Sequence, residues 1–273
     1  MHLIKRRQPS VVLLHSSASS ARQWEQLAAM LTPHFQVRAI ELHGHGDQPA
    51  WRSDARMTLA DEAALAVAAL EEADGAHVVG HSFGGAVALK LATMYPEQVR
   101  SVVAYEPVLF RLILDDLTDT TSAQTVVAVA DSMRAHLAAG NSHSAAQVFI
   151  DFWSGAGAWN SLPAAKQSSI AARMHSVIQH FDALFYEPLR LGDLARLPMP
   201  SMFVSGSRTV DVTRRIAAAL RAALPAAEHE VLPAMGHMGP ITHAAEFNRR
   251  LVRFLYAQQD LSTPALEPLS KAA

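Results

Sequence analysis

Cysteine is missing from this 273-residue sequence, and its absence excludes disulfide bonds, thiol catalysis and thiolate metal ligands. Long apolar runs are missing as well, since none approaches the about 20 residues that span a bilayer. The basic start, 1–7, precedes the short apolar run 11–14, whereas a secretory signal core has about 7–15 residues. We therefore predict a cytoplasmic protein without a membrane span.

An excess of charge of either sign is also lacking. The 23 Lys and Arg residues nearly balance the 25 Asp and Glu residues, and they form no basic stripe. Because nucleic-acid-binding proteins concentrate positive charge on one surface, we predict no nucleic-acid partner. Half of the residues are hydrophobic and 18% are charged, which is typical of a globular protein. The sequence does not specify an oligomeric state.

Segments with the pattern of strands alternate with segments that have the pattern of helices. Six short segments are the strand candidates: 11–15, 35–41, 77–80, 99–105, 201–205 and 228–232. Helical patterns separate or follow them, at 22–31, 59–72, 85–94, 212–224 and 244–256. This alternation predicts an α/β fold in which helices cover both faces of a mostly parallel, six-stranded sheet.

A candidate nucleophile lies in the run Gly80-His81-Ser82-Phe83-Gly84-Gly85, between a predicted strand and a predicted helix. A serine on such a sharp turn adopts strained backbone angles, and glycine on either side removes steric clashes. The pattern therefore predicts Ser82 as a nucleophile whose hydroxyl is presented to substrate. The alternative is an ordinary strand-to-helix turn.

A candidate base lies in the loop after the last predicted strand. A serine hydroxyl is a weak nucleophile until an imidazole accepts its proton. His237, in Gly236-His237-Met238-Gly239, has the position expected of that base, and the alternative is a histidine of a surface loop. His81 and His15 are interpreted as structural residues, and His243 as the start of the last helix.

With its G-x-S-x-G turn and its late Gly-His loop, the chain resembles the α/β-hydrolase family. The resemblance implies a hydrolase that needs no cofactor and acts on a small-molecule substrate. It also implies a helical cap, which we place at 108–193 because that interval has helical patterns and no convincing strand. Residues 1–107 and 194–257 would form the core, and 258–273 a C-terminal tail. We expect the family's first hairpin to be absent, because about ten residues precede the first strand.

The predicted cap is rich in aromatic residues. The interval 149–186 contains seven of the 18 Phe, Trp and Tyr residues. Phe149, Phe152 and Trp153 have the spacing of one helix face. Such a stripe is usually the packing core of the helices themselves. The alternative is the wall of an apolar substrate pocket.

A third residue, the acid that would face the charged imidazole, departs from the family's commonest pattern. In that pattern an aspartate lies three residues after the glycine that ends the fifth strand. Thr209 occupies that position, and threonine carries no charge. Glu106 ends the strand after the nucleophile turn and is our first candidate, because some lipases and dehalogenases resemble this arrangement. Pro107 should bias it to an extended backbone. Asp211 is the alternative acid, and the third possibility is that no acid functions.

The resemblance also indicates an oxyanion hole, formed by two backbone N–H groups. Phe83 follows the nucleophile and would donate one of them. The second normally follows a His-Gly pair after the first strand. Here that stretch is His15-Ser16-Ser17, so Ser17 is the expected donor and Ser16 would carry backbone strain in place of glycine.

Other readings of the motifs stay open. His43, His45 and Asp47 begin a metal-ligand pattern, but Gln48 stands where its last histidine would be, so we predict no metal site. The favoured function is a serine hydrolase that forms an acyl-enzyme with a small, largely apolar ester, amide or related carbonyl compound. The alternatives are a slow or non-catalytic ligand-binding protein, a carbon–carbon bond hydrolase and an acyltransferase.

Overall fold

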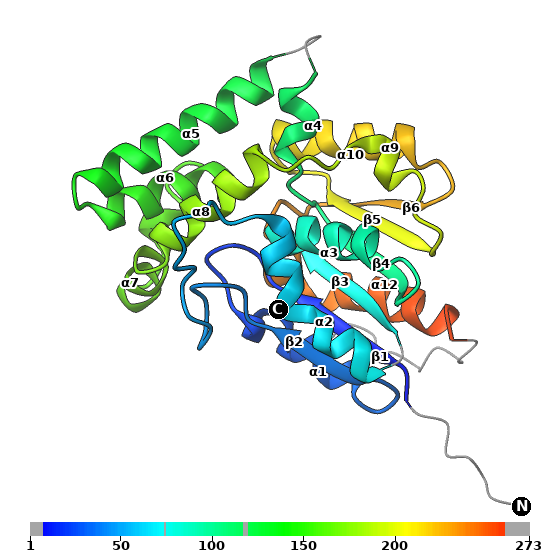
Figure 1. The fold of residues 1–273 in the computed structure, drawn as a ribbon. Helices are drawn as coiled ribbons and strands as arrows, with labels where there is room; N and C mark the ends of the chain where they lie inside the picture. Colours follow the sequence, from blue (N-terminus) through cyan, green and yellow to red (C-terminus); the bar gives the residue numbers. More distant parts are fainter. Residues whose placement is uncertain (1–7, 74, 117–119, 260–273) are drawn as a thin grey trace, which may run out of the picture.

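The computed structural model of the protein describes residues 8–73, 75–116 and 120–259 (Figure 1). Six strands form one parallel sheet in the order β2-β1-β3-β4-β5-β6. Their bounds are β1 Ser10–Leu14, β2 Gln36–Ile40, β3 Ala76–His81, β4 Val99–Tyr105, β5 Ser201–Gly206 and β6 Glu228–Leu232. The predicted α/β fold with a six-stranded parallel sheet is confirmed. Within the described residues no strand precedes β1.

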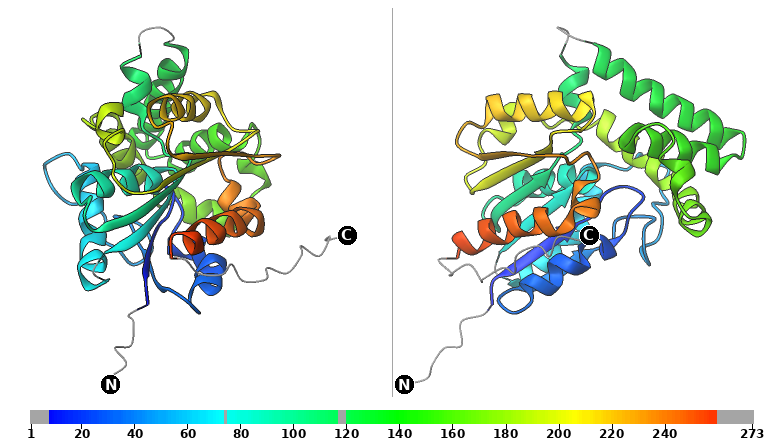
Figure 2. Two further views of the ribbon diagram at one scale, coloured as in Figure 1. Left: turned by 90° about the vertical axis from the view of Figure 1, so that its right-hand side faces the viewer. Right: turned by 180° about the vertical axis from the view of Figure 1, so that it is seen from behind.

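Helices cover both faces of the sheet (Figure 2). On one face lie α2 (Leu59–Ala73), α3 (Phe83–Met94) and α10 (Asp211–Ala223), and on the other lie α1 (Glu25–Leu31) and α12 (Ala244–Ala257). Strand β1 shows why both faces are buried: Val12 and Leu14 join the core of the first face, whereas Val11 and Leu13 join that of the second. Successive strand side chains point to opposite faces, so a continuous apolar run suits this position.

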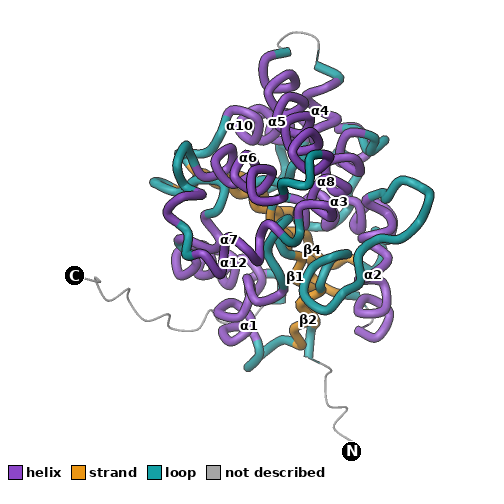
Figure 3. Tube along the Cα trace, turned by 90° about the vertical axis from the view of Figure 1, so that its left-hand side faces the viewer, coloured by secondary structure: helices purple, strands orange, loops and turns teal. Residues whose placement is uncertain are grey.

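Further helices lie between β4 and β5. They are α4 Phe110–Leu114, α5 Thr121–Ala138, α6 Ser142–Ser154, α7 Ala164–Ala171, α8 Met174–Phe185 and α9 Leu191–Leu194. We call them the inserted helices, and α6, α7 and α8 lie in front of the sheet in Figure 3. The helical segment 164–185 forms two helices, because α7 ends at Ala171 and α8 starts at Met174. The division into core and cap stays a prediction.

Short elements complete the fold. A 3₁₀ turn, η1 (Ala21–Trp24), precedes α1, another, η2 (Trp159–Ser161), precedes α7, and α11 (Gly239–Thr242) precedes α12. The predicted tail 258–273 lies outside the described residues, except for its first two positions. Among the helices that the structure describes, none has both the length and the hydropathy of a membrane span.

Candidate functional site

Ser82 lies on the turn between β3 and α3, where its backbone has φ 57° and ψ −117°. A non-glycine residue with positive φ is strained, and such strain is typical of functional turns. Neighbouring backbone explains the flanking glycines. A Cβ at Gly80 would lie 2.1 Å from the carbonyl oxygen of Gly84, and a Cβ at Gly84 would lie 2.4 Å from that of His15. The sequence therefore folds locally into the turn that its glycines predict.

The structure brings three predicted site residues together. His237 Nε2 lies 2.8 Å from Ser82 Oγ, and His237 Nδ1 lies 2.7 Å from Glu106 Oε2. The three side chains are buried, with 5% of Ser82, 2% of His237 and 1% of Glu106 exposed. In this geometry the Ser82 hydroxyl can donate to Nε2 while the Nδ1–H group donates to the carboxylate. The arrangement can thus move a proton from the serine to the imidazole.

Glu106 is fixed by donors from the strand and loop beside it. The Gly206 N–H donates to Oε1 at 2.7 Å, and the Thr209 hydroxyl donates to Oε2 at 2.6 Å. Thr209 in turn lies 2.7 Å from the hydroxyl of Thr213, which can donate to it. Thr209 occupies the position where the resemblance led us to expect an acid, and it orients the carboxylate of Glu106. The sequence analysis did not assign this role to Thr209. The signal for it was that Thr209 stands where the family's commonest pattern has the acid.

Two expectations about the acid need correction or qualification. The backbone of Glu106 is left-handed, with φ 43°, and not extended as Pro107 predicts. Its N–H donates to Val204 O at 2.9 Å, and this bond together with the three contacts of its carboxylate outweighs the local preference. Asp211 begins α10, where its exposed carboxylate pairs with Arg214 and not with His237.

The loop 16–18, which follows β1, lies beside the serine turn, and we call it the oxyanion loop after its predicted role. Gln23 Oε1 accepts from both the N–H and the hydroxyl of Ser16, at 3.1 and 3.0 Å. The expected strain at Ser16 is wrong, because the left-handed residue of this loop is Ala18, with φ 60°. Phe83 is the first residue of α3, so its N–H has no acceptor within the helix.

His81 supports the loop that carries His237. Its Nε2 donates to the carbonyl oxygen of His237 at 2.8 Å, and its Nδ1 accepts from Gln23 at 3.0 Å. Burial, together with the nearby His237, lowers the pKa of His81 well below its ordinary value, so this ring is neutral. His81 therefore holds the backbone of His237, the predicted base, which is a structural role.

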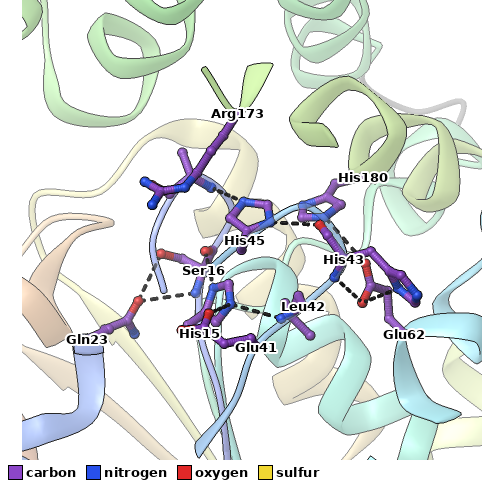
Figure 4. Close-up of polar contacts among 11 residues, drawn as sticks. His15, Ser16, Gln23, Glu41, Leu42, His43, His45, Glu62, Arg173 and His180 are labelled. Atoms are coloured by element: carbon purple, nitrogen blue, oxygen red, sulfur yellow. Dashed lines mark hydrogen bonds and ion pairs between the residues drawn. The ribbon is translucent and has the colours of Figure 1, made fainter. Parts of the chain in front are cut away.

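The residues that begin the metal-like pattern make other contacts. His43 pairs with Glu62 at 3.1 Å, and His45 Nε2 accepts from the Ala18 N–H at 2.9 Å (Figure 4). Burial holds the pKa of His45 at about 2. In the part of the chain that the structure describes, no three His, Asp or Glu side chains are grouped as metal ligands.

The aromatic residues of the inserted helices divide between two roles. Phe149 and Phe181 pack on one another at 6.3 Å between ring centres, and Phe181 also contacts Phe110, so these rings form a core of the helices. Trp153 instead stacks on His237, with ring centres 4.0 Å apart and an interplanar angle of 24°. An apolar side chain of α6 therefore covers the imidazole.

Comparisons with known proteins agree with this architecture. A profile of the alpha/beta hydrolase family matches residues 11–250. The chain is 40% identical over 101 residues to lipase LipV of Mycobacterium tuberculosis, which is 36% of each protein. It is 33% identical over 93 residues to a pimeloyl-[acyl-carrier protein] methyl ester esterase of Pectobacterium carotovorum, 34% of each. These matches span about a third of the length of the relatives.

Solved structures share the fold over almost the whole chain. An enol-lactonase from Burkholderia xenovorans has a TM-score of 0.73 and 21% identity, covering 91% of this chain and 92% of that one. MenH from S. aureus has a TM-score of 0.73 and 16% identity, covering 93% and 96%. At these identities the likeness shows the fold alone.

Proposed function

This chain belongs to the alpha/beta hydrolase family, and on that premise we propose that it is a serine hydrolase. It would form an acyl-enzyme with a small, largely apolar ester, amide or related carbonyl compound. The observation that carries this proposal is the hydrogen-bonded series from Ser82 through His237 to Glu106, with distances of 2.8 and 2.7 Å. These are the contacts that activate a serine and orient its base.

The reaction follows from the direction of these bonds. Ser82 Oγ attacks the carbonyl carbon of the substrate while His237 Nε2 accepts its proton. The positive charge that forms on the imidazole faces Glu106, 2.7 Å from Nδ1. His237 then protonates the leaving alcohol or amine as its bond to the carbonyl carbon breaks. Water then attacks the carbonyl carbon of the acyl-enzyme while His237 accepts its proton. His237 returns that proton to Ser82 Oγ as the acid product leaves.

The tetrahedral intermediates would place negative charge near two backbone N–H groups, those of Ser17 and Phe83. Donors that are fixed before the reaction stabilise this charge without reorganisation, and a single donor is worth about 10² to 10³ in rate. The position of Phe83 at the start of α3 supports its role, because the helix leaves its N–H unbonded.

The apolar character of the proposed substrate rests on the cover of the site. Trp153 of α6 stacks on His237, so an apolar ring lies against the proposed base. Such a cover favours an acyl or aryl group over a sugar or a highly charged metabolite. The names of the two curated relatives, a lipase and a methyl ester esterase, support an ester as the first substrate class to test.

The test is intact-mass analysis after treatment with a fluorophosphonate, on the wild type and on Ser82→Ala. We expect one adduct in the wild type and none in the variant. An unlabelled, folded wild type would overturn the proposal and favour the ligand-binding alternative. If the wild type is labelled, product analysis with an added alcohol acceptor then separates hydrolysis from acyl transfer.

A further inference from the structure

The oxyanion loop is held by contacts with two parts of the fold that are far apart in the sequence. Ser16 is bonded to Gln23, which belongs to η1 next to the loop in the sequence. Ser17 and Ala18 are contacted instead by α8 and by Arg173, the residue that precedes it. Ser17 Oγ lies 2.8 Å from His180 Nδ1, and the Ala18 carbonyl oxygen lies 3.4 Å from a guanidinium nitrogen of Arg173. α8 and its N-cap residue therefore reach the loop at two successive residues.

His180 contacts both residues that are expected to donate to the oxyanion. It lies on α8 and is fully buried. Besides its bond to Ser17, its ring stacks on the ring of Phe83, with centres 3.8 Å apart and an interplanar angle of 5°. One side chain of the inserted helices thus touches each side of the predicted hole.

The second nitrogen of His180 faces a buried carboxylate (Figure 4). Nε2 lies 3.5 Å from Glu62 Oε1, and within the described residues neither atom has a hydrogen-bond partner of its own. Burial would raise the pKa of Glu62, yet His180 and His43 hold it at about 2, so the group is a carboxylate. Burial lowers the pKa of His180, so the ring carries one proton.

The position of that proton follows from the charges around the ring. A carboxylate favours the proton on the nearer nitrogen, Nε2, because the alternative tautomer would set a lone pair against a negative charge. Nδ1 is then an acceptor, and the Ser17 hydroxyl donates to it. This bond fixes the side chain of Ser17, and through it the direction of the Ser17 N–H.

We propose that His180 is a positioning residue of the oxyanion hole, which it completes by holding Ser17 and Phe83 while Glu62 orients its ring. The inference rests on the proposed function. It assigns to α8 a part in the reaction beyond covering the site, because the hole has its full set of contacts only when α8 is seated on the oxyanion loop.

The test compares variants of the full chain with p-nitrophenyl butyrate as the probe substrate. His180→Phe keeps an aromatic ring against Phe83 but removes both polar contacts. His180→Asn retains an acceptor near the position of Nδ1. We expect His180→Phe to lower kcat by about 10- to 100-fold with a change in KM below about threefold, since a displaced donor acts on the transition state. His180→Asn should recover most of that loss.

The partner variant Ser17→Ala removes the same hydrogen bond from the other side and keeps the backbone N–H. It should lower kcat to a similar extent, and the double variant Ser17→Ala/His180→Phe should be no slower than the slower single variant. His175→Ala is the matched control, because His175 lies on the same helix and is exposed. Its kcat should equal that of the wild type.

The outcomes separate the two proposals. A wild type that is neither labelled by fluorophosphonate nor active overturns the proposed function, and this inference with it. A labelled, active wild type whose folded variants keep their kcat, or whose losses multiply in the double variant, overturns the role of His180 alone. If His180→Phe does not fold, Ser17→Ala and His180→Asn decide the question by the same criteria.

Discussion

Replacing Glu106 by glutamine tests the proposed acid most directly. The carboxylate accepts from the Gly206 N–H, the Thr209 hydroxyl and His237 Nδ1. A glutamine has one acceptor oxygen and one amide nitrogen that only donates. If the oxygen stays with Gly206, the NH₂ group faces Nδ1 and favours the tautomer in which Nε2 carries the proton. That tautomer cannot accept the proton of Ser82.

The magnitude follows from the wrong tautomer and the lost charge. Exchange of the carboxylate for an amide in a serine triad lowers kcat by about 10⁴, so we expect a loss of about 10³ to 10⁴ for Glu106→Gln. This equals about 4 to 5.5 kcal/mol in the activation free energy. The assay is kcat/KM for p-nitrophenyl esters, with a thermal melt to confirm that the variant is folded.

The control is Asp211→Asn, which changes the other candidate carboxylate. Asp211 pairs with Arg214 at the surface of α10, so its exchange should leave kcat/KM within about twofold of the wild type, as for other exposed ion pairs. The reasoning is refuted if Glu106→Gln keeps wild-type turnover, and a large loss in Asp211→Asn would transfer the role to that residue.

Three further perturbations have expected outcomes. Thr209→Val should lower kcat by about tenfold, because it deletes a donor to the proposed acid. Thr125→Val, at an exposed position of α5, should not change kcat, and steady-state kinetics on both variants measures this. Gly84→Ala should abolish the native fold in circular dichroism, since its Cβ would meet backbone at 2.4 Å, whereas Gly192→Ala, with no atom closer than 3.9 Å, should fold. The free energy of unfolding should fall as the pH drops below about 6.5, because the folded-state pKa of His45 is about 2 and only the unfolded chain binds its proton. For this group the free energy of unfolding should change by about 1.4 kcal/mol per pH unit. Urea titrations at several pH values measure this dependence, which should be weaker in His45→Gln.

Much of the fold and the centre of the site could be predicted from the sequence. The inner strands β1, β3, β4 and β5 are short, largely apolar runs that are buried on both faces, whereas the edge strands β2 and β6 are partly exposed. Ser82 and His237 lie in glycine-rich turns, where backbone geometry limits which residues fit. Glu106 could be proposed because it ends a strand next to the nucleophile, and parallel strands end at the same edge of a sheet.

The remaining features depend on contacts between distant parts of the chain. Ser17 and His180 are 163 residues apart in the sequence, and no local pattern connects them. The bonds of Thr209 and Glu106 span 103 residues, so the hydroxyl could be located but its partner could not. The left-handed backbone of Glu106 likewise reflects tertiary hydrogen bonds that outweigh the preference set by Pro107.

The place of Glu106, the proposed acid, directly after β4 has a consequence for the order of folding. Ser82 and Glu106 end adjacent strands, and the Ser82 N–H donates to the Tyr105 carbonyl oxygen at 2.9 Å. The two strands are joined by α3 and the short loop 95–98, so the unit of β3, α3 and β4 has a low entropy of closure and can form early. His237 joins Glu106 across 131 residues. Under the proposed mechanism, activity therefore requires this long-range docking, and partial unfolding at that end would remove His237, the proposed base, while leaving Ser82 and Glu106 in place.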